Sequence, residues 1–98
     1  MEKRKPHCPL PVVHALVEQG QVRATMTALG GAVALGMEFD DMLNVVRELT
    51  LRDFFKSMTS HADSRVWQDV YRPSTMAGEV YLKLTVIEDV LIVSFKEL

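Results

Sequence analysis

The stretch that decides the fold is VYLKLTVIEDVLIVSFKEL, residues 80–98, because apolar and polar side chains alternate along it on both sides of Glu88–Asp89. Such alternation is typical of β-strands that bury one face. We predict a hairpin with a two-residue turn at Glu88–Asp89, although Glu-Asp is not the favoured Asn-Gly type of turn. Ile87 then faces Val90, and this match fixes every other cross-strand pair.

The predicted register gathers the large apolar side chains on one face of the hairpin, since cross-strand partners share a side. Its apolar pairs are Val86–Leu91, Leu84–Val93 and Leu82–Phe95. A slip of one residue would move Val93 and Phe95 to the polar side, so core packing favours this register. The opposite face then pairs Thr85 with Ile92, Lys83 with Ser94, and Tyr81 with Lys96.

Two interpretations of that polar face are open. A polar outer face is ordinary for a half-exposed sheet, and the methylenes of a lysine commonly cover a tyrosine ring. Alternatively, the face cleaves RNA without a metal ion. That reaction needs deprotonation of a 2′-OH, stabilisation of negative charge on phosphate oxygens and protonation of the leaving 5′ oxygen. Lys and Arg suit the second need, and Lys or Tyr suits the proton transfers.

The first half of the chain is predicted to form helices. An apolar helical repeat begins after Pro9 and stops at Gly20, and a second apolar run covers Thr27–Leu35. The second run contains Gly30–Gly31, and each glycine disfavours a helix interior by roughly 1 kcal/mol relative to alanine. A third helix is predicted with Asp40 as its N-cap. It carries apolar residues at helical spacing: Met42, Leu43, Val46 and Leu49.

Strands are predicted after Lys56. Thr50 and Asp53 have the spacing of a capping box, which we expect to open a short turn through Phe54–Phe55. VWQDVYR, residues 66–72, is β-branched and aromatic, as strands are. Helices followed by strands indicate a single α+β domain over residues 1–98, with N-terminal helices packed on a C-terminal antiparallel sheet.

Composition excludes several classes of protein. The chain has 98 residues, 48% of them hydrophobic, which suits one domain with a real core. A net charge of −2 argues against non-specific coating of nucleic acid. One cysteine permits no internal disulfide, which favours a cytoplasmic location. It builds no zinc site with three scattered histidines, so no metal or cofactor is expected. The longest uncharged segment has 14 residues, too few to span a membrane.

Three segments closely resemble the motility quorum-sensing regulator (MqsR) toxins of bacterial toxin–antitoxin systems. They are FFKSMTSHAD, VWQDVYRP and the closing VYLKLTVIEDVLIVSFKEL. MEKRKPH and QGQVRATMTALG are similar too, so the likeness covers nearly the full chain. The resemblance implies a RelE-like bacterial ribonuclease fold. It also implies a toxin that inhibits translation and growth by cutting mRNA selectively, with a preference for GCU sites.

The resemblance implies four catalytic residues: Lys56, Gln68, Tyr81 and Lys96. We expect the two lysines to hold the scissile phosphate, Tyr81 to lead proton transfer and Gln68 to orient phosphate or base. Gln68 reaches the same face only if its strand pairs with the next one in an odd-sum register, for example opposite Lys83. The expected RNA-binding residues are Arg72, Lys83, His7 and Met58, of which Lys83 comes from the hairpin register.

The resemblance also implies two partners. One is mRNA, and the other is a cognate antitoxin that joins a zinc-binding domain to a helix-turn-helix DNA-binding domain. Any effect on operator DNA would then be indirect, and any zinc would belong to the antitoxin. Two alternatives are open: a RelE-type nuclease that cuts only on the ribosome, and a non-catalytic module that binds a protein through an open sheet edge. The segment after Lys56 has four basic and six acidic residues, so weak, salt-sensitive RNA binding is expected.

Overall fold

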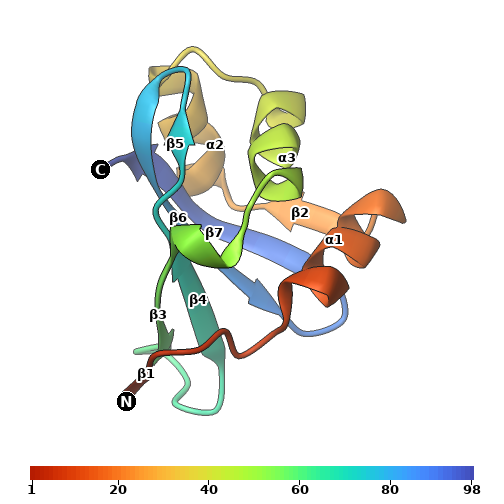
Figure 1. Cartoon of the computed structure of the whole chain (residues 1–98), viewed down its shortest axis with the longest axis vertical. Helices are drawn as coiled ribbons and strands as arrows, with labels where there is room; N and C mark the ends of the chain where they lie inside the picture. Colours follow the sequence, from red (N-terminus) through yellow and green to blue (C-terminus); the bar gives the residue numbers. More distant parts are fainter.

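The computed structural model describes residues 1–98 and contains both helices and strands (Figure 1). The helical elements are α1 (Leu10–Glu18), α2 (Met26–Ala34), α3 (Phe39–Arg47) and the short 3₁₀ turn η1 (Leu51–Asp53). The strands are β1 (Glu2–Lys3), β2 (Val22–Ala24), β3 (Phe54–Thr59), β4 (Trp67–Tyr71), β5 (Ser74–Thr75), β6 (Gly78–Val86) and β7 (Val90–Glu97). The predicted α+β class is confirmed. None of the helices is long and apolar enough to cross a membrane.

The seven-stranded sheet has the order β1-β3-β4-β6-β7-β2, and β5 pairs with β6 outside this path. All neighbours are antiparallel except β2, which runs parallel to β7. The prediction of an antiparallel sheet was therefore wrong at this edge. β1 and β2 also interrupt the predicted order of helices before strands. Both have only two or three residues, too few to show an alternating pattern.

The hairpin of β6 and β7 follows the predicted register only in the half farther from the loop. Tyr81 pairs with Lys96, and the predicted Leu82–Phe95 and Lys83–Ser94 pairs also form. Nearer the loop the register shifts, and the pairs are Leu84–Ile92, Thr85–Leu91 and Val86–Val90. The connection is therefore a three-residue loop, not a turn at Glu88–Asp89, and Val93 is the extra residue of a β-bulge.

This shift changes which side chains enter the core. Val90 and Ile92 are fully buried, whereas Leu91 and Val93 are half-buried. Ile87 belongs to the loop and is 75% exposed. The apolar pattern alone did not distinguish the two registers, because large apolar residues occupy consecutive positions in this part of β7.

The hydrophobic core combines side chains from all three helices with those of β4, β6 and β7. Its largest fully buried members are Tyr71, Phe95, Met42, Leu82, Leu84 and Ile92. Burying one such side chain contributes roughly 1.5–3 kcal/mol. α1 begins after Pro9 as predicted, and Gly20 follows it with φ of 74°, in the left-handed region that glycine favours.

α2 runs through both Gly30 and Gly31, which confirms a helix here. The two glycines have different surroundings. A Cβ on Gly31 would lie 1.8 Å from the carbonyl oxygen of Phe95, whereas a Cβ on Gly30 would meet nothing within 4 Å. Only a glycine at position 31 therefore lets α2 approach the backbone of β7 this closely. Figure 1 shows α2 beside the end of β7.

Two local predictions around α3 need correction. The N-cap of α3 is Glu38, not Asp40, and the Asp41 carboxylate accepts a hydrogen bond of 2.8 Å from the backbone N–H of Glu38. Asp40 is the second residue of the helix, where its negative charge still interacts favourably with the helix N-terminus. The capping box of Thr50 and Asp53 is confirmed, with an N–H to carboxylate distance of 2.9 Å. The predicted turn after it is wrong, because β3 begins at Phe54.

Candidate active site

One row of side chains crosses four strands on the face of the sheet that points away from the core. Lys56 pairs with Val70, Val70 with Lys83, and Lys83 with Ser94. Cross-strand partners share a side, so these four side chains lie together. Val70 is fully buried yet does not belong to the core cluster, which agrees with its place on this second face.

Neighbouring rows extend the same face. Met58 pairs with Gln68 on one side of the first row, and Tyr81 pairs with Lys96 on the other. Side chains two positions apart in a strand point the same way. We call this surface the basic face and define it by its residues: Lys56, Met58, Gln68, Val70, Tyr81, Lys83, Ser94 and Lys96.

The register of β4 against β6 is the odd-sum register that Gln68 needs in order to share a face with Lys83. Asp69 pairs with Leu84 and Val70 with Lys83, so the paired numbers have an odd sum. Gln68 therefore shares the face of Lys83. The suggested pairing of Gln68 with Lys83 itself is wrong, because Val70 occupies that position.

Tyr81 and Lys96 form the predicted pair. The ammonium nitrogen of Lys96 lies 5.3 Å from the centre of the Tyr81 ring, within cation–π distance. Lys96 is exposed and Tyr81 half-buried, so an incoming anion can reach the ammonium group. The arrangement places a cation beside a phenol ring, whose hydroxyl can give or take a proton.

Lys56 has an acidic partner that sequence reasoning missed. Its Nζ donates a hydrogen bond of 3.0 Å to the Glu2 carboxylate, which β1 brings alongside β3. This hydrogen bond and the positive charge lower the pKa of Glu2 below its ordinary value. A two-residue strand gives no sequence signal of its own, so nothing pointed to this contact.

Arg72 and Phe55 lie at the edge of the basic face, next to Lys56. The Arg72 guanidinium carbon is 4.6 Å from the centre of the Phe55 ring, and Lys56 Nζ is 5.4 Å from it. The backbone N–H of Arg72 donates to the carbonyl of Asp53 at 2.7 Å, which fixes the chain where it leaves β4. Sequence reasoning placed Phe55 in a turn and gave it no part in the site.

His7 lies apart from the other expected site residues. Its ring stacks on Trp67 with a centroid distance of 5.4 Å, and Trp67 alternates with Gln68 and so faces the opposite side of the sheet. The backbone N–H groups of His7 and Cys8 donate to the buried Asp69 carboxylate at 2.9 and 3.0 Å. The structure therefore brings the other seven expected residues to one surface and holds His7 on the other.

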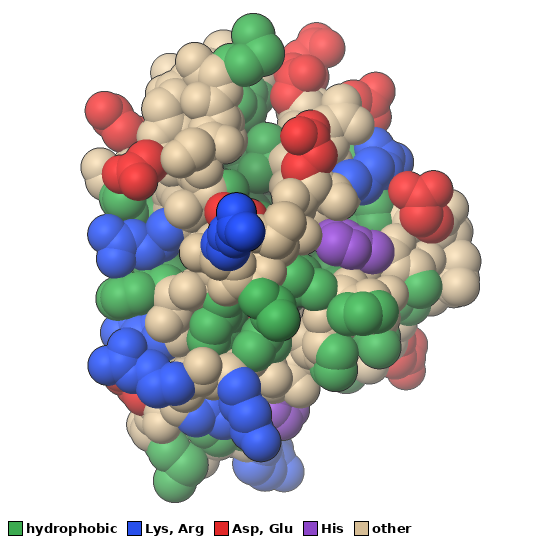
Figure 2. All heavy atoms as spheres, in the orientation of Figure 1, with side chains coloured by type: hydrophobic (Ala, Val, Ile, Leu, Met, Phe, Trp, Pro, Cys, Tyr) green, Lys and Arg blue, Asp and Glu red, His purple; other side chains and the backbone are tan.

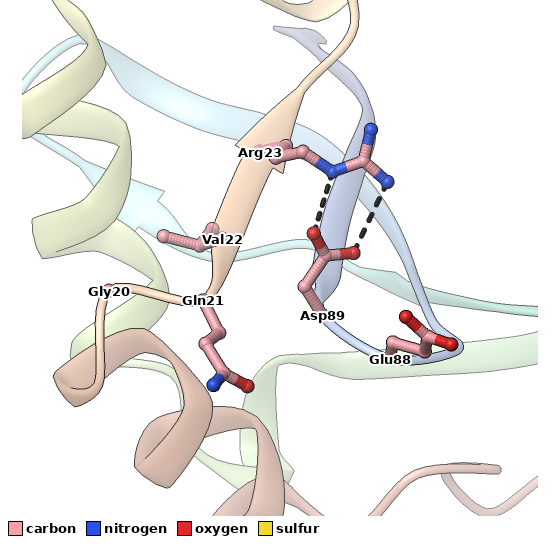
Figure 3. Close-up of a pocket in the computed structure, with 6 residues that line it drawn as sticks. All are labelled: Gly20, Gln21, Val22, Arg23, Glu88 and Asp89. Atoms are coloured by element: carbon pink, nitrogen blue, oxygen red, sulfur yellow. Dashed lines mark hydrogen bonds and ion pairs between the residues drawn. The ribbon is translucent and has the colours of Figure 1, made fainter.

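Two cavities lie outside the basic face. One, of about 450 Å³, adjoins β2 and the β6–β7 loop (Figure 3). There Arg23 donates two hydrogen bonds to Asp89, of 2.6 and 3.2 Å. The guanidinium lowers the pKa of the Asp89 carboxyl, and the carboxylate raises that of Arg23. Since this cation is already paired, the cavity offers little attraction to another anion.

The second cavity, of about 640 Å³, lies between α3 and the β5 segment. Its charged lining is entirely acidic: Asp41, Glu48 and Asp53. Figure 2 shows acidic side chains around the upper part of the molecule, with most Lys and Arg side chains lower in the view. An acidic cavity repels phosphate. No group of three or more His, Cys, Asp or Glu side chains is arranged to hold a metal ion.

Comparison with known proteins gives two agreeing results. Residues 5–97 match the model of the family described as "Motility quorum-sensing regulator, toxin of MqsA". The chain is also 59% identical over 97 residues to a protein of Escherichia coli (strain K12) named "mRNA interferase toxin MqsR". That alignment covers 99% of each chain, so the similarity extends over nearly the whole fold.

Proposed function

Because the chain belongs to the motility quorum-sensing regulator toxin family, we propose that it is an mRNA interferase, an endoribonuclease that cuts messages and so inhibits translation. The observation that carries the proposal is the composition of the basic face. The pairings that gather Lys56, Gln68, Tyr81 and Lys96 follow from strand register. A phosphodiester bound there meets cations and a phenol together.

The proposed reaction is attack of a 2′ oxygen on the adjacent phosphorus. The 2′-OH loses its proton, the bond to the 5′ oxygen breaks, and that oxygen gains a proton. Tyr81 leads the proton transfers, while Lys56 and Lys96 stabilise the charge that develops on the phosphate oxygens. Gln68 orients phosphate or base through hydrogen bonds. No step of this reaction requires a metal ion.

Three finer features belong to the same proposal. The fold is RelE-like, with α1, α2 and α3 packed over the core side of the sheet; side chains from all three helices enter the core, which supports this. Cleavage prefers GCU sites. The protein acts in the cytoplasm, and its inhibitor is an antitoxin with a zinc-binding domain and a helix-turn-helix domain.

The test mixes the purified chain with a GCU-containing RNA in excess EDTA. We expect cleavage by the wild type and a loss of at least about a hundredfold in kcat for Tyr81→Phe and for Lys56→Ala. Tyr71→Phe is the matched control, because Tyr71 is fully buried on the core side and its hydroxyl has no hydrogen-bond partner.

The possible outcomes separate the alternatives. Cleavage only in a parallel reaction that contains ribosomes and Mg²⁺, without EDTA, would indicate a ribosome-dependent nuclease. A folded wild type that cuts under neither condition would leave a binding module as the better description. Cleavage that survives both substitutions would keep the nuclease and move its site away from the basic face.

A further inference from the structure

Phe55 is an exposed aromatic side chain beside two cations of the proposed site. We propose that its ring stacks on a nucleobase next to the scissile phosphate, which makes it a base-binding position of the RNA site. The proposal rests on the proposed function, because it names how that site holds its substrate.

The backbone places Phe55 there by an irregularity in β3. Phe54 pairs with Tyr71, while Lys56 pairs with Val70, so Phe55 is an extra residue without a partner in β4. In a regular strand, adjacent residues face opposite sides, and Phe55 would not share a side with Lys56. The bulge brings both side chains to the same region, with Lys56 Nζ 5.4 Å from the centre of the ring.

The charges around the ring fit a nucleotide. Arg72 and Lys56 lie 4.6 and 5.4 Å from its centre, which puts two phosphate-binding cations within reach of one aromatic surface. Proteins that hold single-stranded RNA combine such cations with aromatic rings on which bases stack. Burial of the ring against the protein is incomplete, since 37% of Phe55 is exposed.

A protein partner fits this spot less well. Phe55 is the only aromatic residue among the exposed large hydrophobic side chains; the others are Met1, Val12, Met26, Val33, Leu51, Met76, Ile87 and Leu98. Two cations, Arg72 and Lys56, lie beside its ring. One isolated ring offers about the contact area of one base, whereas a stable protein interface needs far more apolar surface.

A purely structural role for Phe55 would be to cover Val70, which is fully buried on the same face. Leucine can provide that cover but has no π-surface. Phe55→Leu therefore separates the two roles, and Phe55→Trp restores an aromatic ring. Phe54→Leu is the matched control, because Phe54 packs against the core and contacts Tyr71 edge-on.

The experiment measures binding of each variant to a GCU-containing RNA made non-cleavable by a 2′-O-methyl group at the cut site. Stacking of one base contributes roughly 1–3 kcal/mol, so we expect Kd to rise at least about fivefold in Phe55→Leu. Phe55→Trp should bind as the wild type does or more tightly. Phe54→Leu should lower the stability of the fold and leave Kd unchanged.

A second set of RNAs locates the stacked base. Each carries one abasic nucleotide near the cut site. At one position, we expect the abasic RNA to bind wild type and Phe55→Leu equally, because the partner of the ring is missing. In cleavage assays with intact RNA, Phe55→Leu should raise KM more than it changes kcat.

Failure of this proposal differs from failure of the proposed function. If the wild type cuts RNA and Phe55→Leu binds with unchanged Kd, the stacking role is wrong and the nuclease remains. If the wild type binds RNA without cutting it and Phe55→Leu weakens binding, the stacking role stands and the nuclease is wrong. If the wild type does neither, both are wrong.

Discussion

Lys56 has an anionic partner before any RNA binds. The Glu2 carboxylate accepts its hydrogen bond at 3.0 Å, and the lysine side chain is 25% exposed. A phosphate that binds Lys56 must therefore share it with Glu2 or displace that carboxylate. The residue expected to hold the substrate also binds a side chain of β1 at the edge of the sheet.

The Lys56–Glu2 contact predicts a pH effect with a definite sign. Because Lys56 depresses the pKa of Glu2, the contribution of the pair to folding is complete above the unfolded-state pKa of Glu2 and is lost as pH falls through the lower folded-state value. Lys56→Met should raise the Glu2 pKa toward its ordinary value of about 4.5. An NMR titration of the Glu2 carboxyl group measures this shift.

Asp89 serves as the control for that titration. The pKa of Asp89 is lowered by Arg23 of β2. Because β2 lies at the opposite edge of the sheet from β1, Lys56→Met should leave this pKa unchanged. Identical Glu2 titrations in wild type and Lys56→Met would contradict the ion pair.

Residues of the proposed site could be predicted from sequence only where the alternation of apolar and polar residues determines which face of the sheet a side chain occupies. Tyr81 and Lys96 were paired correctly because burial of Leu82 and Phe95 leaves their neighbours on the polar side. Phe55 was missed because a bulge moves it, and a bulge has no apolar pattern. The chemical roles of Tyr81 and Lys96 rest on the family resemblance and remain predictions.

At the scale of elements, α2 depends on one of its two glycines. Gly30→Ala should raise the free energy of unfolding by about 0.5–1 kcal/mol, since alanine favours the helix and the site has room. Gly31→Ala should lower it by about 1–3 kcal/mol, because the new methyl group collides with the Phe95 carbonyl. Urea unfolding of both variants measures the two effects.

The pair of variants controls for helix propensity, because both make the same chemical change one residue apart. Equal shifts of the same sign would mean that α2 does not approach β7 as described. Gly31→Ala should also weaken RNA cleavage, since Lys96 follows Phe95 directly in β7.

The elements themselves were predictable to different degrees. α1, α3 and the outer half of the β6–β7 hairpin follow from long apolar repeats. β1 and β2 do not, because strands of two or three residues carry no period and their partners lie far away in the sequence. The prediction of a two-residue turn was wrong because Ile87 and Leu91 are both apolar, and an apolar residue at these positions is compatible with either register.

At the scale of the whole molecule, RNA binding should depend on salt only moderately. Four cations lie on or beside the basic face: Lys56, Arg72, Lys83 and Lys96. For single-stranded nucleic acid, the slope of log Kobs against log salt is about −0.7 for each neutralised phosphate, so we expect a slope no steeper than about −3. Titrations of non-cleavable RNA at several salt concentrations measure it.

Lys83→Ala should make that slope shallower by about 0.7. Arg65→Ala is the control, because Arg65 lies in the β3–β4 loop and is paired with Asp63. A slope unchanged in Lys83→Ala would remove Lys83 from the RNA contacts. A change of similar size in Arg65→Ala would mean that RNA binds along the loop as well.

β7 comes after every strand and helix that it contacts. It lies between β6 and β2 in the sheet, and α2 packs on it. A growing polypeptide therefore carries Lys56, Gln68 and Tyr81 for some time before the strand with Lys96 exists, and until then its core is open. A truncated translation product that stops before β7 would have neither a closed core nor the Tyr81–Lys96 pair. The proposed site is therefore incomplete until β7 has been made.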